Sequence, residues 1–299
     1  MKTTSKNILL INFSLLVRVR IFNVIMLILA MYISAIYLFC DGQNVLGNLK
    51  TLKLHGIVFS SALSAMAGYI INFFYDQEKD KMYRPLTTMM QRFVNQGTAL
   101  RIYILFNGIS LTIAAVLSYR IFFFFLVYQF LIWFYSHKIS RIVFLNNLTN
   151  SVLMIFPFLA LFLFYENFSS FILYLAGFLF LTILIRDIFK DLDSFQYDDL
   201  FNYNTLPNTI GIIPTKIIID VLLGLLIIVS TLLTFEPHLQ EIRLYYLLTV
   251  FLSSFVFIGL WFVNKRQYIQ ILIYMIKFWI FLGTISLLFI KGNPLPLYF

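Results

Sequence analysis

The sequence predicts an all-α integral membrane protein. Hydrophobic residues make up 61% of the 299 residues and charged residues only 12%, and the mean hydropathy is +0.89. Soluble proteins carry about 25% charged residues, so this composition excludes an ordinary soluble domain. The apolar runs are also continuous and long, as a helix that crosses a bilayer requires. We therefore expect one bundle of membrane-spanning helices that forms a single domain over residues 1–299.

Apolar stretches long enough to cross a bilayer occur nine times in the sequence. A β-barrel is excluded because its strands alternate apolar and polar residues, whereas "IFFFFLVYQFLIWFY" is almost uninterrupted in its apolar character. Helices then remain as the way to satisfy the backbone in lipid. The expected spans are 21–40, 55–75, 98–118, 120–135, 148–165, 170–190, 214–235, 243–263 and 267–290.

The positions of Lys and Arg predict the orientation, because these residues concentrate on the cytoplasmic side. With the N-terminus inside, only five of the 22 Lys and Arg residues fall in outer connections. We expect the basic N-terminal segment to lead straight into the first span, with the N-terminus cytoplasmic and the C-terminus outside, as in a bacterial inner membrane. The net charge of +9 then reflects topology and attraction to anionic lipids, and no nucleic acid is needed as a partner. The five outer residues are Lys50, Lys53, Arg120, Arg243 and Lys291.

The acidic residues gather in two places, each following an expected span on the inner side. Eight of the 13 acids lie there, although the other inner connections are basic and nearly free of acids. One such cluster would be an ordinary solvated helix end, but two on the same side argue for a shared task. They are Asp76, Glu78 and Asp80 after the second span, and Asp187, Asp191, Asp193, Asp198 and Asp199 after the sixth.

The spacing of these acids places them on helix faces. Asn72, Asp76 and Asp80 step by four residues and so stack along one face of a helix. Asp187, Asp191 and Asp198 also share a face if the sixth helix continues, with Ser194 between them. Like charges at this spacing repel unless cations neutralise them. Sets of oxygen donors suit hard cations, and Mg²⁺ in proteins is usually shared between carboxylates and phosphates.

Basic residues interleave with both acid rows, and such residues bind phosphate groups. Lys79 and Arg84 flank the first row, and Arg186 and Lys190 lie within the second. Acids for a metal and bases for phosphate together predict a diphosphate site.

The two clusters resemble the signature motifs of the UbiA superfamily of intramembrane prenyltransferases. "GYIINFFYDQEKDKMYRP" resembles the first motif, NDxxDxxxD, and "RDIFKDLDSFQYDDLFNYNTLPNTIG" resembles the second Asp-rich motif. Arg20 and Asn23 also stand where the family often has Arg and Asn. The resemblance covers about residues 18–220, and the family shares the nine expected spans.

The resemblance implies an Mg²⁺-dependent enzyme. It would transfer an isoprenyl group from a polyprenyl diphosphate, such as geranylgeranyl or farnesyl diphosphate, to a lipophilic acceptor, releasing diphosphate at the inner face. The acceptor would be a quinone or aromatic precursor or a glyceryl-phosphate ether. The implied catalytic residues are Asp76, Asp80, Asp191 and Asp198, and the implied metal ligands are these four together with Asn72 and Asp187. The diphosphate would be bound by Asn72, Lys79, Arg84, Arg186 and Lys190. The acceptor would contact Tyr135 and Asn147.

The chain departs from the family pattern at four positions. Phe73 and Ser194 stand where Asp is usual, and Tyr197 and Asn202 replace usual glycines. Phe73 predicts that one ligand of the first site is missing. Two alternatives therefore stay open, a weakened homologue that only binds prenyl diphosphate and a transporter whose acids bind a coupling cation. The oligomeric state cannot be read from the sequence.

Overall fold

The computed structural model describes residues 2–40, 45–83, 85–91, 93–166, 170–201, 203–262 and 266–290. Over these ranges the chain is helical and contains no strand, and nine helices are long and apolar enough to cross a membrane. The expected all-α membrane fold is thus confirmed. The nine spans are Ile21–Phe39, Leu52–Tyr83, Gln96–Leu117, Tyr119–His137, Leu145–Tyr165, Phe171–Leu200, Ile212–Thr234, Pro237–Gly259 and Arg266–Phe289.

The chain folds into two compact units. One comprises Met1–Leu29 and Leu52–Ile139, and the other comprises Ala30–Thr51 and Ser140–Phe299. The chain passes from the first unit to the second within α2 (Ile21–Ser34). That the two units act as one domain stays a prediction.

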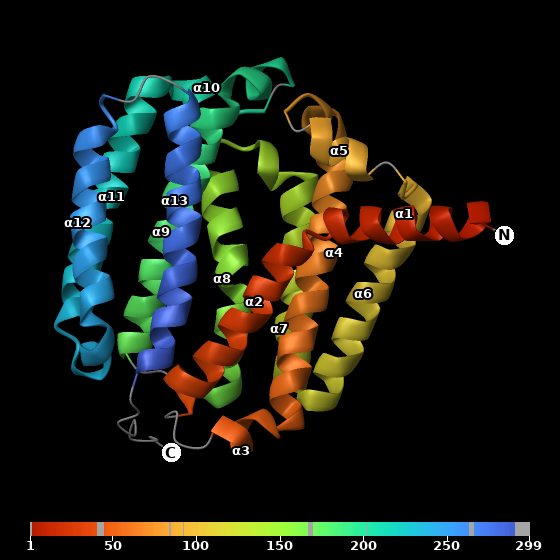
Figure 1. The fold of residues 1–299 in the computed structure, drawn as a ribbon, viewed down its shortest axis with the longest axis horizontal. Helices are drawn as coiled ribbons and strands as arrows, with labels where there is room; N and C mark the ends of the chain where they lie inside the picture. The colour runs from red at the N-terminus through yellow and green to blue at the C-terminus, as the bar shows by residue number, and fades with distance from the viewer. Residues whose placement is uncertain are drawn as a thin grey trace. The chain divides into compact units, whose positions relative to one another are not determined.

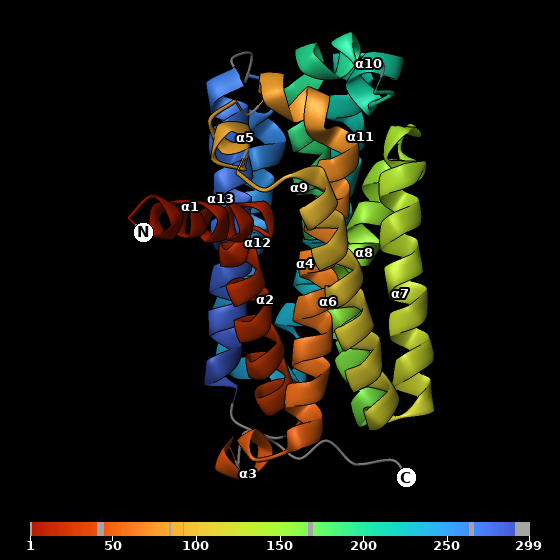
Figure 2. The same cartoon turned by 90° about the vertical axis from the view of Figure 1, so that its right-hand side faces the viewer.

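In the first unit α4, α6 and α7 pack side by side, and α1 crosses the axis of α4 (Figures 1 and 2). Ser118 separates α6 from α7, because its backbone is extended (φ −175°, ψ 150°) and its Oγ accepts a hydrogen bond from the Arg120 N–H at 3.1 Å. The division expected near Tyr119 is therefore correct. The helices of this unit are α1 (Lys2–Arg18), α4 (Leu52–Tyr83), α5 (Pro85–Gln91), α6 (Gln96–Leu117) and α7 (Tyr119–His137).

The N-terminal segment differs from the expectation. The basic segment does not lead straight into the first span but forms a helix of its own, α1, that ends at Arg18. The chain then turns at Arg20, whose positive φ of 50° breaks the helical path before α2 begins at Ile21. This turn directs α1 nearly perpendicular to the spanning helices of its unit (Figures 1 and 2).

Buried hydrogen bonds join the three packed helices of the first unit. Ser60 and Ser110 each donate to the other's backbone carbonyl, at 3.2 and 3.0 Å, and the hydroxyls of Ser64 and Ser110 lie 2.9 Å apart. Gln129 of α7 donates to Ser64 at 3.1 Å. Small polar residues let helices approach closely in a membrane while their hydroxyls bond across the contact. These bonds hold α4, the helix with the first acid row, against its neighbours.

In the second unit α9 occupies the centre, in contact with α8, α10, α11 and α13 (Figure 1). This position explains why so many of its side chains are buried. The elements of this unit are η1 (Ala35–Phe39), α3 (Val45–Leu49), α8 (Leu145–Tyr165), α9 (Ser170–Leu200), α10 (Leu206–Ile210), α11 (Ile212–Thr234), η3 (Pro237–Ile242), α12 (Arg243–Gly259), α13 (Arg266–Ser286) and η4 (Leu287–Phe289).

The two helices that carry the acid rows are the longest of the described chain, with 32 residues in α4 and 31 in α9. At a rise of about 1.5 Å per residue each is about 45–50 Å long. The hydrocarbon core of a bilayer is only about 30 Å thick. Each helix is therefore long enough to span and to extend its acid-bearing end beyond the hydrocarbon, and α9 remains helical through the second motif, as its row of acids requires.

Candidate active site

The first acid row lies on the last turns of α4. The Nδ2 of Asn72 donates a hydrogen bond to Asp76 Oδ2 at 3.0 Å, which confirms that these residues share a helix face. Asn72, Asp76, Lys79 and Asp80 are all half-buried, so part of each residue is exposed. The row thus offers carboxylate and amide oxygens together with one cation.

The end of α4 is joined to the short helix that follows it. Thr88 of α5 donates through its hydroxyl to the backbone carbonyl of Asp80 at 3.0 Å. Arg84, expected to bind diphosphate, is outside the described residues. Asn202, after α9 in the sequence, is outside them too. Tyr135, expected to contact the acceptor, is half-buried in the last turn of α7.

Phe73, which stands where the family usually has Asp, is buried and 8% exposed. Its ring faces the guanidinium of Arg18 from α1, a residue that the sequence did not single out. The Arg18 guanidinium also donates to the carbonyls of Gln91 and Val94, at 2.9 Å each. The ring is therefore part of the packing between α1, α4 and the segment after α5.

The second acid row lies on α9 and is more deeply buried than the first. Asp187, Asp191 and Asp198 are 4%, 6% and 0% exposed. Burying a charged carboxylate in protein is costly unless hydrogen bonds or opposite charges compensate for the lost hydration. The partners of these carboxylates therefore determine what the row can bind.

Asn147, in the first turns of α8, links two of these carboxylates. Its Nδ2 donates to Asp187 Oδ2 at 3.2 Å and to Asp191 Oδ2 at 2.8 Å, and the side chain is fully buried. The sequence predicted an acceptor contact for this residue and gave no sign of a bond to the acids. One amide thus holds an oxygen from each of two carboxylates one helical turn apart.

The two bases expected in the second row differ in their surroundings. Lys190 is half-exposed and its Nζ lies 3.8 Å from Asp187 Oδ1, a loose ion pair within α9. Arg186 is half-buried and its Nη2 donates to the sulfur of Met154 in α8 at 3.1 Å. The Lys190 side chain is therefore partly open to solvent, whereas Arg186 is held against α8.

Ser194, which stands where Asp is usual in the family, bonds within the row. Its Oγ donates to Asp198 Oδ2 at 2.5 Å, and both side chains are buried. A hydroxyl in this position supplies a hydrogen bond to the carboxylate where a second Asp would supply a like charge. The substitution therefore gives Asp198 a neutral hydrogen-bonded neighbour one helical turn away.

A further group fixes α9 to α13, and sequence reasoning missed it. Asp193, on a different face from the row, accepts hydrogen bonds from Arg266 Nε at 2.8 Å and from Gln270 Nε2 at 3.0 Å. The Arg266 guanidinium also lies 5.2 Å from the centre of the Tyr197 ring. Tyr197, which replaces a usual glycine, thus packs under the cation that anchors this part of α9.

The donors of the second row fit a hard divalent cation better than a soft one. They are carboxylate and amide oxygens, which Mg²⁺ prefers, and the carbonyl oxygen of Asn147 is buried without a hydrogen-bond partner among the described residues. Over the same ranges no three His, Cys, Asp or Glu side chains converge on one metal-sized point. Two carboxylates and an amide would suit a cation that completes its shell with water or phosphate oxygens, as Mg²⁺ does.

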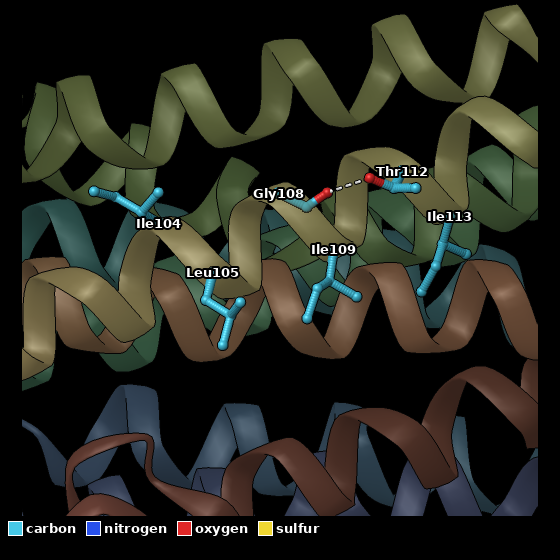
Figure 3. Close-up of a pocket in the computed structure, with 6 residues that line it drawn as sticks. All are labelled: Ile104, Leu105, Gly108, Ile109, Thr112 and Ile113. Atoms are coloured by element: carbon cyan, nitrogen blue, oxygen red, sulfur yellow. Dashed lines mark hydrogen bonds between the residues drawn. The ribbon is translucent and has the colours of Figure 1, made fainter.

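An apolar groove of about 410 Å³ lies on one face of α6, where Ile104, Leu105, Ile109 and Ile113 line it (Figure 3). Its one polar side chain, Thr112, already donates to the Gly108 carbonyl at 2.9 Å. The groove therefore offers no group that would bind a diphosphate, and its lining suits hydrocarbon.

The fold is that of a multi-pass helical membrane protein, and each of its two acid rows carries carboxylate oxygens. The chain belongs to the UbiA prenyltransferase family, whose model matches residues 31–283. Its members transfer prenyl groups, and this chain is accordingly a prenyltransferase.

Similar sequences occur among curated archaeal enzymes named digeranylgeranylglyceryl phosphate synthase. The chain is 33% identical to that of Saccharolobus solfataricus over 224 residues, which cover 72% of this chain and 77% of the relative. It is 30% identical to that of Thermococcus sibiricus over 173 residues, which cover 56% of this chain and 60% of the relative.

Solved structures share the fold. A UbiA homologue from Archaeoglobus fulgidus bound to GPP and Mg²⁺ superposes with a TM-score of 0.68 at 15% identity, over 92% of this chain and 99% of that chain. A structure described as that of digeranylgeranylglyceryl phosphate synthase in membranes superposes with a TM-score of 0.69 at 17% identity, over 93% and 97% of the two chains.

Proposed function

We propose that this prenyltransferase uses Mg²⁺ to transfer a prenyl group from a polyprenyl diphosphate to a glyceryl-phosphate ether lipid. The observation that carries the proposal is the buried pair of carboxylates, Asp187 and Asp191, held by one amide of Asn147. The names of the similar archaeal enzymes support the choice of acceptor.

In this proposal the chain's own residues hold the diphosphate and shield the reacting carbon. The oxygens for Mg²⁺ come from Asn72, Asp76 and Asp80 on α4 and from Asp187, Asp191 and Asp198 on α9. The positive charge for the diphosphate comes from Lys79 and Lys190. When bound, Mg²⁺ supplies Lewis-acid stabilisation of the departing diphosphate. The apolar helices exclude water, which protects an allylic cation from hydrolysis until the acceptor oxygen attacks.

A transfer assay tests the proposal. The purified protein is incubated with radiolabelled geranylgeranyl diphosphate, Mg²⁺ and either a geranylgeranylglyceryl phosphate or an aromatic acceptor. We expect labelled ether lipid, which requires Mg²⁺ and is lost in Asp76→Asn and Asp191→Asn. The matched control is Asp199→Asn, which changes an exposed carboxylate on the same helix and should keep activity. Labelling of the aromatic acceptor alone would overturn the choice of acceptor, and diphosphate binding without turnover would support the weakened homologue.

We also propose that the acid rows face the cytoplasm, with the N-terminus inside and the C-terminus outside. The uneven distribution of Lys and Arg supports this orientation. In a Cys40→Ser background, Gln240→Cys should react with an impermeant thiol reagent added outside intact cells, whereas Lys138→Cys should react only after lysis. Both positions are exposed in the structure, so the reversed pattern would overturn the orientation.

A further inference from the structure

Asn147 bonds both Asp187 and Asp191, at the centre of the second acid row. The two N–H groups of its amide go to different carboxylates, each at the Oδ2 atom. One oxygen of each carboxylate is thus oriented by the protein itself. The Oδ1 atoms receive nothing from this amide, and Lys190 Nζ lies 3.8 Å from the Oδ1 of Asp187, so positive charge can approach there.

The orientation of the amide is fixed by its partners. An ionised carboxylate accepts hydrogen bonds and donates none. The amide nitrogen of Asn147 must therefore face the two carboxylates, and its oxygen must point away from them. That oxygen is buried and has no hydrogen-bond partner among the described residues. Buried polar atoms in proteins nearly always have a partner, so this oxygen is available to a water molecule or to a cation.

The first turns of α8 are built to hold this side chain still. The backbone N–H of Asn147 is bonded to the side chain of Asn146 at 2.5 Å, and its backbone carbonyl accepts from Ser151 Oγ at 2.8 Å. Asn146, Asn147 and Ser151 are all buried. The amide is therefore presented from a rigid backbone, as a residue that orients metal ligands requires.

We propose that Asn147 is a positioning residue for the divalent cation of the second acid row. It holds Asp187 and Asp191 close together against their mutual repulsion and offers its own carbonyl oxygen to the hydrated cation. This inference rests on the proposed function, since it assumes that the row binds Mg²⁺. It assigns to Asn147 a role in metal binding in place of the acceptor contact expected from the sequence.

Cation binding can be measured without turnover, from the rise in unfolding temperature of the purified full-length protein as Mg²⁺ alone is added. Removal of a residue that orients metal ligands weakens metal affinity about 10–100-fold. We expect Asn147→Ala to raise the Mg²⁺ concentration at half-effect by that factor, and the matched control Asn150→Ala, on the same helix, to leave it unchanged. A wild-type midpoint in Asn147→Ala would overturn the proposal.

A nearly isosteric variant covers the case in which Asn147→Ala does not fold. Asn147→Asp removes both donors and places a third carboxylate beside the other two. Without Mg²⁺ it should unfold at a lower temperature than the wild type, and saturating Mg²⁺ should raise its unfolding temperature by more than it raises that of the wild type. An equal rise in both proteins would overturn the proposal.

The outcomes separate this inference from the proposed function. If Asp191→Asn shifts the Mg²⁺ midpoint while Asn147→Ala and Asn147→Asp behave as the wild type, Asn147 does not position the cation but the proposed use of the row stands. If the Asn147 variants shift the midpoint and the wild type transfers no prenyl group, the inference holds and the proposed function fails.

Discussion

The guanidinium of Arg18 lies 4.7 Å from the centre of the Phe73 ring. An arginine stays protonated in proteins, so although burial lowers the pKa of Arg18, the ring covers a charged group. The face of an aromatic ring attracts a cation in this geometry. Phe73 is therefore the packing partner of a buried cation, in a position where the motif alone suggested a missing metal ligand.

Phe73→Asp should consequently fail to create a metal ligand. The new carboxylate would pair with Arg18, and the loss of the buried ring should destabilise the protein by about 3–5 kcal/mol, the cost of truncating a buried Phe. The Mg²⁺ concentration that gives half of the rise in unfolding temperature should stay within about twofold of the wild-type value. The reason is that the new ion pair only replaces the contact between Arg18 and the Phe73 ring. A tighter midpoint would show that position 73 reaches the cation.

Ser194→Ala should destabilise the second acid row. It removes the donor that bonds Asp198 Oδ2 at 2.5 Å and leaves a buried carboxylate with one hydrogen bond fewer. The expected loss is about 1–3 kcal/mol in the free energy of unfolding. Denaturant unfolding of the purified protein measures it, and Ser194→Thr, which keeps the hydroxyl, is the control. Equal stability of the Ala and Thr variants would contradict the role assigned to this hydroxyl.

Arg266 and Asp193 should be energetically coupled. Their hydrogen bond of 2.8 Å joins α13 to α9, but the Arg266 side chain is 42% exposed, so solvent screens part of the interaction. In a double-mutant cycle with Arg266→Ala and Asp193→Asn, we expect a coupling of about 0.5–2 kcal/mol in the free energy of unfolding. Strictly additive losses would show that the pair contributes nothing to holding α9.

Gly283→Ala should destabilise the contact between α12 and α13. A Cβ at this position would lie 2.4 Å from the Tyr245 hydroxyl oxygen and 2.8 Å from its ring carbon Cζ, so the ring would have to move. Tyr245 is bonded to the Trp279 carbonyl at 3.2 Å and stacks on its ring, which limits that movement. Overpacking of this kind costs about 1–3 kcal/mol, and the unfolding temperature should fall.

The control for this prediction is Gly224→Ala, because a Cβ there meets nothing within 4 Å. Alanine favours a helix over glycine by up to about 1 kcal/mol, so this variant should unfold at the same or a higher temperature. A fall of equal size in both variants would assign the effect to glycine itself and not to Tyr245.

The sequence predicted the nine spans and both acid rows, because each depends on local spacing. Hydrophobic runs and a period of four residues are properties of one helix, and α4 and α9 keep them. The sequence also placed Asn147 near the inner end of its helix, but its bond to Asp191 joins residues 44 positions apart and leaves no local signal. The bond from Arg266 to Asp193 joins residues 73 positions apart and was missed for the same reason.

The sequence by itself thus determined the class of protein, its spanning helices and the faces of its acids, since composition and helical period act within one segment. Only the tertiary structure decided which groups the buried polar atoms contact. Asn147 reaches Asp187 because α8 packs on α9, and Arg18 covers Phe73 because α1 crosses α4. A polar group removed from water requires a partner, and packing between helices determines which partner lies within reach.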